Sequence, residues 1–510
     1  MKKTITFFLA LFTVCLSAQT VNIEGDPYGG NPYATIQDAV NASMEGDVVL
    51  ITGVHTESVS FGKSITLRGT DPTADIVQSA TAPSTDGTGS ATISVIRAED
   101  ADVLNVTIEN LGVRNGNNGG NNGGGINVDK VTGLITLNNL IVQDNFSDRN
   151  GGGIAIAGSN AMIMNCTVSN NSSSLDGGGM ILAPNNGAGT NSVIDIKQSL
   201  IDNNSGRNGG GIYINGNTQF GDDYTINVNV ENTSISNNNS FSPNGGSGGG
   251  AIWSKGAIWT TNEGGTGNTG NVTLQLVHAT VYNNTHGSAV KNGLQFTGPT
   301  DGETNFSAYN SIIVTADAPA QKALNFLNTN TTDVVNCILG GLQNAGPFLS
   351  IIDDAAKNNQ KGKIATFAGI TTGLSDQGGA TNVLAIDENS ASEDYCTATV
   401  SGVTLPSVDQ RGFNRDGTVD AGAFEFDGTF STDLVNALTF KIFPNPTSSY
   451  IQIEGLNQDL KEVKIYSVLG KLEKQSKNSR INLSELSNGV YFVNITTLNN
   501  QNVTKRVIVK

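Results

Sequence analysis

Two arginines occupy equivalent places in nearly identical stretches of the chain, DNFSDRNGGGI and DNNSGRNGGGI. Arg149 and Arg207 each precede Asn-Gly-Gly-Gly, and two carboxylates, Asp148 and Asp176, lie near them in the sequence. An arginine base next to carboxylates that hold Ca²⁺ could remove the α-proton of a uronate, which is the reaction of a polysaccharide lyase. Polar residues beside glycine runs are also ordinary solvated corner residues, and we favour that interpretation for all four.

Other groups able to act as acids, bases or nucleophiles form no recognisable set. Glycoside hydrolysis needs two carboxylates at a defined separation, whereas the available aspartates are scattered: Asp144, Asp202, Asp222 and Asp223. The histidines accompany no G-x-S-x-G turn, so no nucleophile triad is expected. There are three of them: His55, His278 and His286. The glycine runs precede no Lys-Ser or Lys-Thr pair, which argues against a phosphate loop.

Calcium is the one metal that the composition allows. The GDD segment at 221–223 and the recurring Asn and Asp residues carry the oxygen ligands that Ca²⁺ prefers. Most of these residues are neutral Asn, however, whereas tight calcium loops bring several carboxylates together. We therefore expect no cofactor and at most weak calcium binding.

One pattern recurs along the chain: an alternating run ends in an apolar residue, any residue, and then Asn or Asp. The Asx positions form one column: Asn115, Asp144, Asn170, Asn203, Asn237 and Asn283. Glycine runs begin at residues 123, 151, 177 and 209, which are 28, 26 and 32 residues apart. Repeats of this length that contain short strands and no helical pattern predict a solenoid.

Stacking of successive coils would place equivalent side chains about 4.8 Å apart. A narrow interior requires compact residues, and one column supplies them: Leu140, Cys166, Ser199, Thr233 and Ala279. We expect the Asx column to be a buried structural ladder in which each amide bonds to those above and below. Arg149 and Arg207 would then lie two coils apart, about 10 Å.

Residues 33–69 combine an amphipathic stretch with three short strands, VVLI, SVSF and SITL. Ile36, Ala39, Val40 and Met44 would share one helical face. The arrangement resembles the opening of right-handed parallel β-helix proteins of the pectin-lyase-like superfamily, and the resemblance extends through the coils to about residue 345. It implies a helix that covers the exposed edge of the first coil.

The stretch DQRGFNRDGTVDAGAFEF, residues 409–426, resembles the closing segments of bacterial surface β-helix proteins. By that resemblance, residues 346–426 end the β-helix. The same resemblance implies that Arg411, Asp420 and Glu425 are structural residues and perform no catalysis.

A shift in composition marks the last part of the chain. We assign residues 427–438 as a linker, and the alternating strands of residues 439–510, separated by Gly, Asn or Pro turns, predict a small Ig-like β-sandwich. This region closely resembles the type A C-terminal sorting domain of the type IX secretion system of Bacteroidetes. The matching motif residues are Pro444, Asn445, Pro446, Gly470, Leu486, Gly489, Val490, Tyr491, Lys505 and Lys510. The resemblance implies export by the type IX machinery, removal of the tail, and either attachment to surface lipopolysaccharide or release.

The N-terminus and the charge balance agree with export. Residues 1–18 have a basic start, an apolar run and a small-residue end, which predicts a secretory signal peptide cleaved between Ala18 and Gln19. No other apolar run is long enough to span a membrane. Residues 19–439 contain 40 acidic and 16 basic residues, a balance that disfavours nucleic acid and anionic membranes as partners. Three cysteines permit one disulfide, whose pairing the sequence does not fix: Cys166, Cys337 and Cys396.

Together these features predict an all-β protein with a right-handed parallel β-helix over residues 19–426, an N-terminal helical cap and a small C-terminal sandwich. We expect a monomer at the cell surface or outside the cell. Trp253 and Trp259 could stack on sugar rings, but a packed role in the core or at a corner is an equal alternative. Because repeats fill the β-helix and no acid–base set stands out, we favour a non-catalytic, adhesin-like or glycan-binding role. A carbohydrate-active enzyme, a lyase before a hydrolase, is the alternative.

Overall fold

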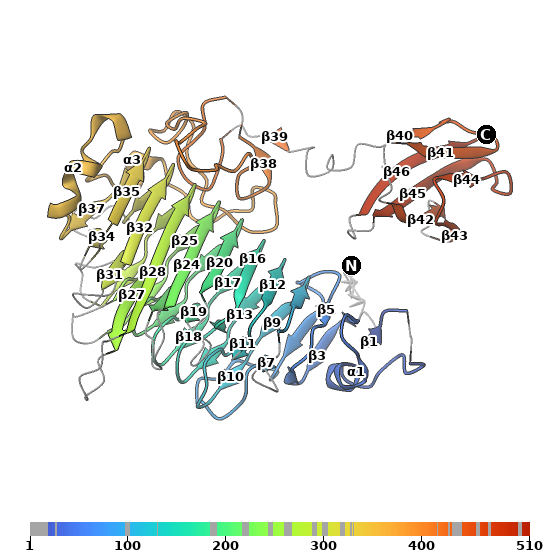
Figure 1. The fold of residues 1–510 in the computed structure, drawn as a ribbon, viewed down its shortest axis with the longest axis horizontal. Coiled ribbons are helices and arrows are strands. Elements are labelled where there is room, and N and C mark those ends of the chain that lie inside the picture. Colours follow the sequence, from blue (N-terminus) through green and yellow to red (C-terminus); the bar gives the residue numbers. More distant parts are fainter. Residues whose placement is uncertain are drawn as a thin grey trace, which may run out of the picture. The chain divides into compact units, whose positions relative to one another are not determined.

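The computed structural model (Figure 1) divides the chain into two compact units, residues 1–429 and 430–510. The structure describes residues 19–25, 28–96, 103–129, 131–183, 191–216, 224–242, 248–259, 268–287, 293–297, 304–316, 322–326, 329, 331–415, 417–426, 429–430, 441–454, 460–467, 471–497 and 502–510. The predicted signal peptide with Ala18, the GDD segment with Asp222 and Asp223, and Gly470 lie outside these ranges.

The first unit is a parallel β-helix, which confirms the predicted fold class. Its strands stack as rungs in three long sheets and one short sheet (Figure 1). Sheet A contains β2 (Val48–Thr52), β5 (Thr66–Arg68), β8 (Val106–Glu109), β12 (Leu134–Asn138), β16 (Asn160–Met164), β20 (Ser192–Lys197), β24 (Tyr224–Glu231), β28 (Asn268–Val277), β32 (Thr304–Tyr309) and β35 (Thr331–Val335). Sheet B contains β3 (Val54–Thr56), β6 (Ile76–Gln78), β9 (Gly112–Arg114), β13 (Ile141–Gln143), β17 (Thr167–Ser169), β21 (Leu200–Asp202), β25 (Ser234–Ser236), β29 (Thr280–Tyr282), β33 (Ile312–Val314) and β36 (Ile338–Leu339).

The other two stacks complete each coil. Sheet C contains β4 (Val59–Phe61), β7 (Ile93–Ile96), β11 (Ile126–Asp129), β15 (Ile154–Ala157), β19 (Met180–Ala183), β23 (Ile212–Gly216), β27 (Ile252–Trp259), β31 (Leu294–Thr297), β34 (Lys322–Phe326) and β37 (Gly341–Gln343). Sheet D contains β10 (Asn117–Asn118), β14 (Phe146–Ser147), β18 (Ser172–Ser173), β22 (Ser205–Gly206), β26 (Asn239–Ser240) and β30 (Thr285–His286). The end of β27 also pairs antiparallel with β28, which joins sheets A and C.

The middle coils turn two sharp corners through residues with left-handed backbone. One corner, between sheets A and B, is formed by Asn110, Asn139, Asn165, Gln198, Asn232, His278, Asn310 and Asn336. The other, between sheets B and D, is formed by the predicted Asx column, in which Asn115 has a φ of 58° and Asp144 a φ of 57°. Asn and Asp tolerate this conformation better than other residues with a Cβ because their short polar side chains bond locally.

The buried ladder lies one residue after the predicted column. Asn170 and Asn203 are exposed, whereas Asn171 and Asn204 are 1% and 0% exposed. The complete ladder is Asn145, Asn171, Asn204, Asn238 and Asn284, and each amide Nδ2 donates to the Oδ1 of the next at 2.9, 3.0, 2.9 and 2.9 Å. The left-handed residue turns the chain, so the residue after it points inward. In the predicted column Asn115 is buried at 4% exposure, and Asn203 and Asn283 donate to Asn170 and Asn237 at 2.6 and 2.7 Å, but the continuous buried ladder lies one position later.

The interior agrees with the predicted alternation of side chains. The compact column at Leu140, Cys166, Ser199, Thr233 and Ala279 is buried, with no member more than 1% exposed. A hydroxyl group in this column also accepts a hydrogen bond from the backbone of the neighbouring coil: Cys166 N–H donates to Ser199 Oγ at 3.1 Å. All three described cysteines are buried free thiols.

The entrance is covered as expected. Strand β1 (Thr20–Ile23) pairs antiparallel with β2, and helix α1 (Ile36–Ala42) buries Ile36, Ala39 and Val40. The Thr35 side chain caps the helix by accepting from Asp38 N–H. Met44 is 64% exposed because the helix ends before it, so its predicted place on the buried face was wrong.

Residues 346–426 cover more than the end of the β-helix. Their elements are η1 (Gly346–Phe348), α2 (Leu349–Ile352), η2 (Ala355–Lys357), α3 (Ala365–Ala368) and β38 (Phe413–Asn414), and β39 (Thr429–Phe430) follows. Ser234 Oγ in β25 donates to Gln410 Oε1 at 2.6 Å, and Thr280 Oγ1 in β29 accepts from Ala423 N–H at 2.9 Å. The segment therefore folds back along the outer face of sheet B, where Ile312, Val314 and Ile338 join its own apolar core.

The second unit is a small antiparallel sandwich. One sheet contains β40 (Lys441–Phe443), β41 (Tyr450–Glu454) and β44 (Arg480–Asn482), and the other contains β43 (Leu472–Ser476), β42 (Leu460–Ser467), β45 (Gly489–Thr497) and β46 (Asn502–Val509). Ile451, Val463, Ile465, Val493 and Val507 are fully buried in its core. Alternate residues on these strands face inward, as the sequence pattern predicted.

Candidate functional site

The two repeated arginines have different environments. Leu175 N–H donates to Arg149 O, and Arg207 N–H donates to Leu175 O, so the arginines lie two coils apart. Arg207 Nε and one terminal nitrogen each donate to Asp176 at 3.0 Å, and Asn208 Nδ2 donates to the same carboxylate at 2.9 Å. The hydrogen bond with Asp176 raises the pKa of Arg207, which makes this guanidinium unsuitable as a base.

The neighbouring carboxylate, Asp148, also has a structural role. Its Oδ1 accepts from Gly120 N–H at 2.6 Å, one coil away. Of the four residues that the sequence singles out, only Arg149 is exposed and has no side-chain hydrogen bond to a described residue.

Arg149 lines a cleft on the outer face of sheet C, at strands β11, β15 and β19. The cleft has a volume of about 140 Å³. Its floor is apolar, with Ala155 and Ile181 on adjacent strands in register, and Ala157 and Ala183 at its rim. Small side chains on the outer face of β15 leave the space open.

Polar groups surround this floor. Asn127 and Asp129 alternate along β11, so both face outward. Asn121 and Asn122 come from the loop that precedes β11, and Arg149 comes from the next coil. The side chains of Asn127, Asp129 and Arg149 make no hydrogen bond to another residue that the structure describes. Asn127 is 8% exposed, Asp129 is half-buried and Arg149 is exposed.

The lining of this cleft does not match the requirements of a glycoside hydrolase or of a polyuronate site. Asp129 is the only carboxylate among the lining residues, whereas glycoside hydrolysis requires two. Arg149 and Asp129 together leave the lining without net charge, which does not suit a polyuronate. Within the described ranges, no group of three or more His, Cys, Asp or Glu residues could hold a metal ion.

Aromatic residues continue the apolar strip along sheet C. Tyr213 and Trp253 lie in register with Ile181, and their rings stack with centroids 4.6 Å apart. Trp253 is 5% exposed, so it packs against its neighbour and does not offer a free ring face. The strand position of Trp259 is described, at the end of β27, but its side chain is not.

A buried charged network holds the closing segment. Arg415 donates to Glu425 at 2.7 Å, to Asn232 Oδ1 of the sheet A–B corner at 3.0 Å and to Gly422 O at 2.9 Å. Both Arg415 and Glu425 have side chains no more than 4% exposed. Burial raises the pKa of Glu425 to about 7, although Arg415 lowers it.

The same network contains the other residues that the resemblance marked as structural. Arg411 forms an ion pair with Asp409 at 2.7 Å and its side chain is 6% exposed. Asp420 Oδ1 accepts from Asp394 N–H at 2.7 Å, and burial raises the Asp420 pKa to about 6. Asp409, Asp420 and Glu425 are buried and Arg411 nearly so, which suits a structural role. The sequence had not indicated Asp409 or Arg415.

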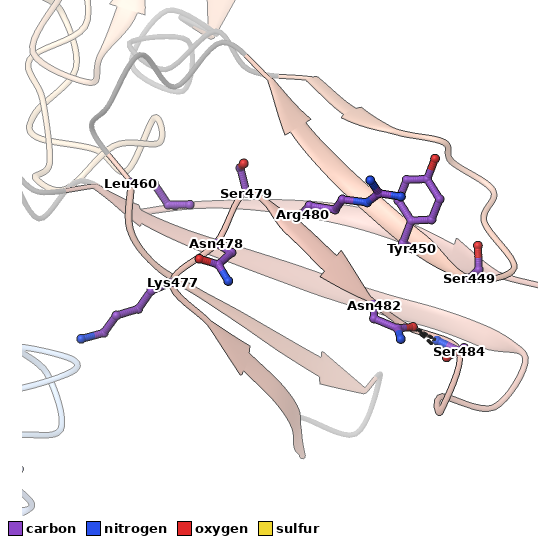
Figure 2. Close-up of a pocket in the computed structure, with 9 residues that line it drawn as sticks. All are labelled: Ser449, Tyr450, Leu460, Lys477, Asn478, Ser479, Arg480, Asn482 and Ser484. Atoms are coloured by element: carbon purple, nitrogen blue, oxygen red, sulfur yellow. Dashed lines mark hydrogen bonds between the residues drawn. The ribbon is translucent and has the colours of Figure 1, made fainter.

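The second unit has an open cavity of about 930 Å³ on the outer face of its three-stranded sheet. Figure 2 shows Arg480 beside the ring of Tyr450, and its guanidinium carbon lies 4.1 Å from the ring centre. Lys477 also lines the cavity but points away from this pair. The lining contains no carboxylate, so it offers no acid–base pair.

The predicted motif residues of this unit occupy its strands and turns. Asn445, between two prolines, accepts from Ile508 N–H at 2.9 Å and so ties the first turn to β46. In β45, Tyr491 is buried and its hydroxyl donates to Ser487 O at 2.8 Å, whereas Val490 is 37% exposed. Lys505 and Lys510 are exposed, Leu486 packs partly against the core, and Gly489 begins β45.

Residues 441–510 match a family model described as a secretion system C-terminal sorting domain. The second unit is a type IX sorting domain. The sorting domain indicates that the protein is exported to the cell surface or the extracellular space, and it implies contact with the type IX machinery. No curated protein and no solved structure matched the chain. No helix among the described residues has the length and hydropathy needed to cross a bilayer.

Proposed function

We propose that the exported β-helix binds a neutral glycan without cleaving it, with one sugar ring in the sheet C cleft. The observation that supports this most directly is the combination of an apolar floor, Ala155 and Ile181, with three polar side chains that have no described protein partner. Sugar rings present an apolar face and a polar edge, and a site of this kind matches both. Small-molecule sites typically combine apolar walls with a few polar groups that fix orientation.

The extracellular location is consistent with this role because polysaccharides are abundant there. The β-helix gives the cleft a rigid base, since its floor strands are held in register on both sides. A rigid site loses little conformational entropy on binding, which favours recognition of a flexible chain.

The test is a glycan array followed by calorimetric titration of the best ligand with the purified chain. Replacing Arg149 with Ala should weaken binding about tenfold or more, because a hydrogen bond to a charged group contributes about 1.5–3 kcal/mol. Ala157→Leu should abolish binding by filling the cleft from its partly exposed rim. Lys197→Ala, a change of similar size in an exposed ion pair on sheet A, is the matched control and should leave affinity unchanged. Equal affinity of Arg149→Ala and the wild type would contradict the proposal.

A further inference from the structure

The sorting domain exposes a row of apolar side chains on its four-stranded sheet. Leu472 and Phe492 are 44% and 40% exposed, and Tyr466 pairs directly with both of them across neighbouring strands. Val490, two residues before Phe492 on the same face, pairs with Ile508 on the edge strand. The five residues therefore form one continuous patch, here named the apolar sheet face.

This patch is additional to the core of the sandwich. In β45, Tyr491, Val493 and Ile495 point inward and are buried, so the alternate residues Val490 and Phe492 must point outward. A solvated sheet face is normally polar, and contiguous exposed apolar side chains mark an interaction site. The outer face of the other sheet carries two aromatic side chains of similar exposure, Phe443 at 40% and Tyr450 at 38%; they come from β40 and β41, and Arg480 lies over the Tyr450 ring.

Two lysines border the apolar sheet face, and each is paired with a glutamate. Lys464, on the same face of β42 as Tyr466, forms an ion pair with Glu462 at 2.9 Å, and Lys471, next to Leu472, forms one with Glu473 at 3.2 Å. Residues 440–510 as a whole contain ten Lys or Arg and five Asp or Glu residues. This net positive charge would attract an acidic partner to the domain, and the aromatic residues at the centre of the apolar sheet face would supply most of the affinity.

We propose that the apolar sheet face is the surface by which the sorting domain docks to a protein of the type IX machinery, and that this protein presents an apolar patch bordered by acidic residues. The sorting role of the domain identifies the binding partner of this face, because export requires that the machinery recognise this unit. The inference rests on that role and is independent of the glycan-binding proposal.

The experiment compares export of full-length variants in a host that has the type IX machinery. Phe492→Ser should reduce the amount of protein at the cell surface and in the medium to below about a tenth of wild type, because central aromatic anchors commonly contribute 2 kcal/mol or more. Tyr450→Ser removes a ring of similar exposure from the other sheet and should export normally. Unfolding temperatures of the purified variants show whether folding is affected, and Leu472→Ser on the edge strand provides a second test of the same face if Phe492→Ser unfolds.

Normal export of both Phe492→Ser and Leu472→Ser would overturn the proposal, as would an equal defect in Tyr450→Ser. A photo-crosslinking residue at position 492 distinguishes the possible occupants. Crosslinks to a machinery protein in cells support the proposal, whereas crosslinks within the purified chain or between two copies would contradict it. Glycan binding by the purified variants should remain unchanged, so failure of either proposal can be recognised separately.

Discussion

Asn204 explains how the coils are held in register. Its Nδ2 donates to Asn238 Oδ1 at 2.9 Å and to Val168 O at 2.9 Å. Its Oδ1 accepts from both the backbone and the side chain of Asn171, each at 3.0 Å. One fully buried amide therefore makes hydrogen bonds to the coil before it and the coil after it. This arrangement requires Asn at the same position in each successive coil.

The sequence indicated this ladder but not its position. Asn occurs in pairs at these corners, as in Asn170–Asn171 and Asn203–Asn204. The first member has left-handed backbone and the second has the buried amide. Asn suits both roles, so composition alone does not distinguish them.

Replacing Asn204 with Ala should lower the free energy of unfolding by about 2–3 kcal/mol, because it leaves buried backbone and amide groups without partners. Urea unfolding followed by circular dichroism measures this. Asn203→Gly is the matched control, since residue 203 is exposed and glycine accepts its φ of 53°. A loss in Asn203→Gly as large as that in Asn204→Ala would argue against the buried ladder.

Glu425 should make stability depend on pH. Burial raises its pKa in the folded protein from an ordinary 4.5 to about 7, so the folded state holds the proton more tightly than the unfolded state. This contribution is fully present below about pH 4.5 and is lost as the pH rises to about 7. We expect a decrease of roughly 3 kcal/mol in the free energy of unfolding across that window.

Glu425→Gln tests this directly because glutamine keeps an acceptor for Arg415 but does not titrate. Asp420, whose pKa is also raised, is present in both proteins, so the difference between their pH profiles isolates Glu425. Parallel profiles between pH 4.5 and 7 would show that Glu425 is not perturbed.

Among the larger elements, the closing segment differs most from expectation. Its charged residues were expected to be structural by resemblance, but its position along sheet B was not. Ile312 and Val314 point outward from β33, yet they are as apolar as a residue of the interior, because both faces of this strand are apolar. Their residue types therefore do not show which side faces outward. Only the fold shows that a second layer covers this strand.

Arg415→Ala should release this layer. The change leaves the buried Glu425 without its cation and breaks the bond to Asn232, which we expect to cost about 3–5 kcal/mol. Limited proteolysis should then cut within residues 371–426 before it cuts the coils. Lys361→Ala, in an exposed ion pair of the same segment, serves as the control. A cleavage pattern like that of the wild type would contradict the proposed role of the network.

For the molecule as a whole, the sequence predicted the β-helix, the sorting domain and export, because each has a repeated or motif-based pattern. The cleft was only partly foreseen. Arg149 was identified, but Asn127 and Asp129 lie on another coil, and no local pattern brings them together. Nor does the sequence reveal that Arg207, in the second copy of the repeat, forms an ion pair with Asp176 while Arg149 has no such partner among the residues that the structure describes.

The central claim is that the cleft holds its ligand intact. The most direct measurement incubates the purified chain with the best ligand from the array, with and without Ca²⁺, and analyses the sugar by mass spectrometry and ultraviolet absorbance. The account predicts saturable binding that weakens in Arg149→Ala, and recovery of the ligand at its original length. Shorter or unsaturated products that disappear in Arg149→Ala would show instead that the protein is a lyase.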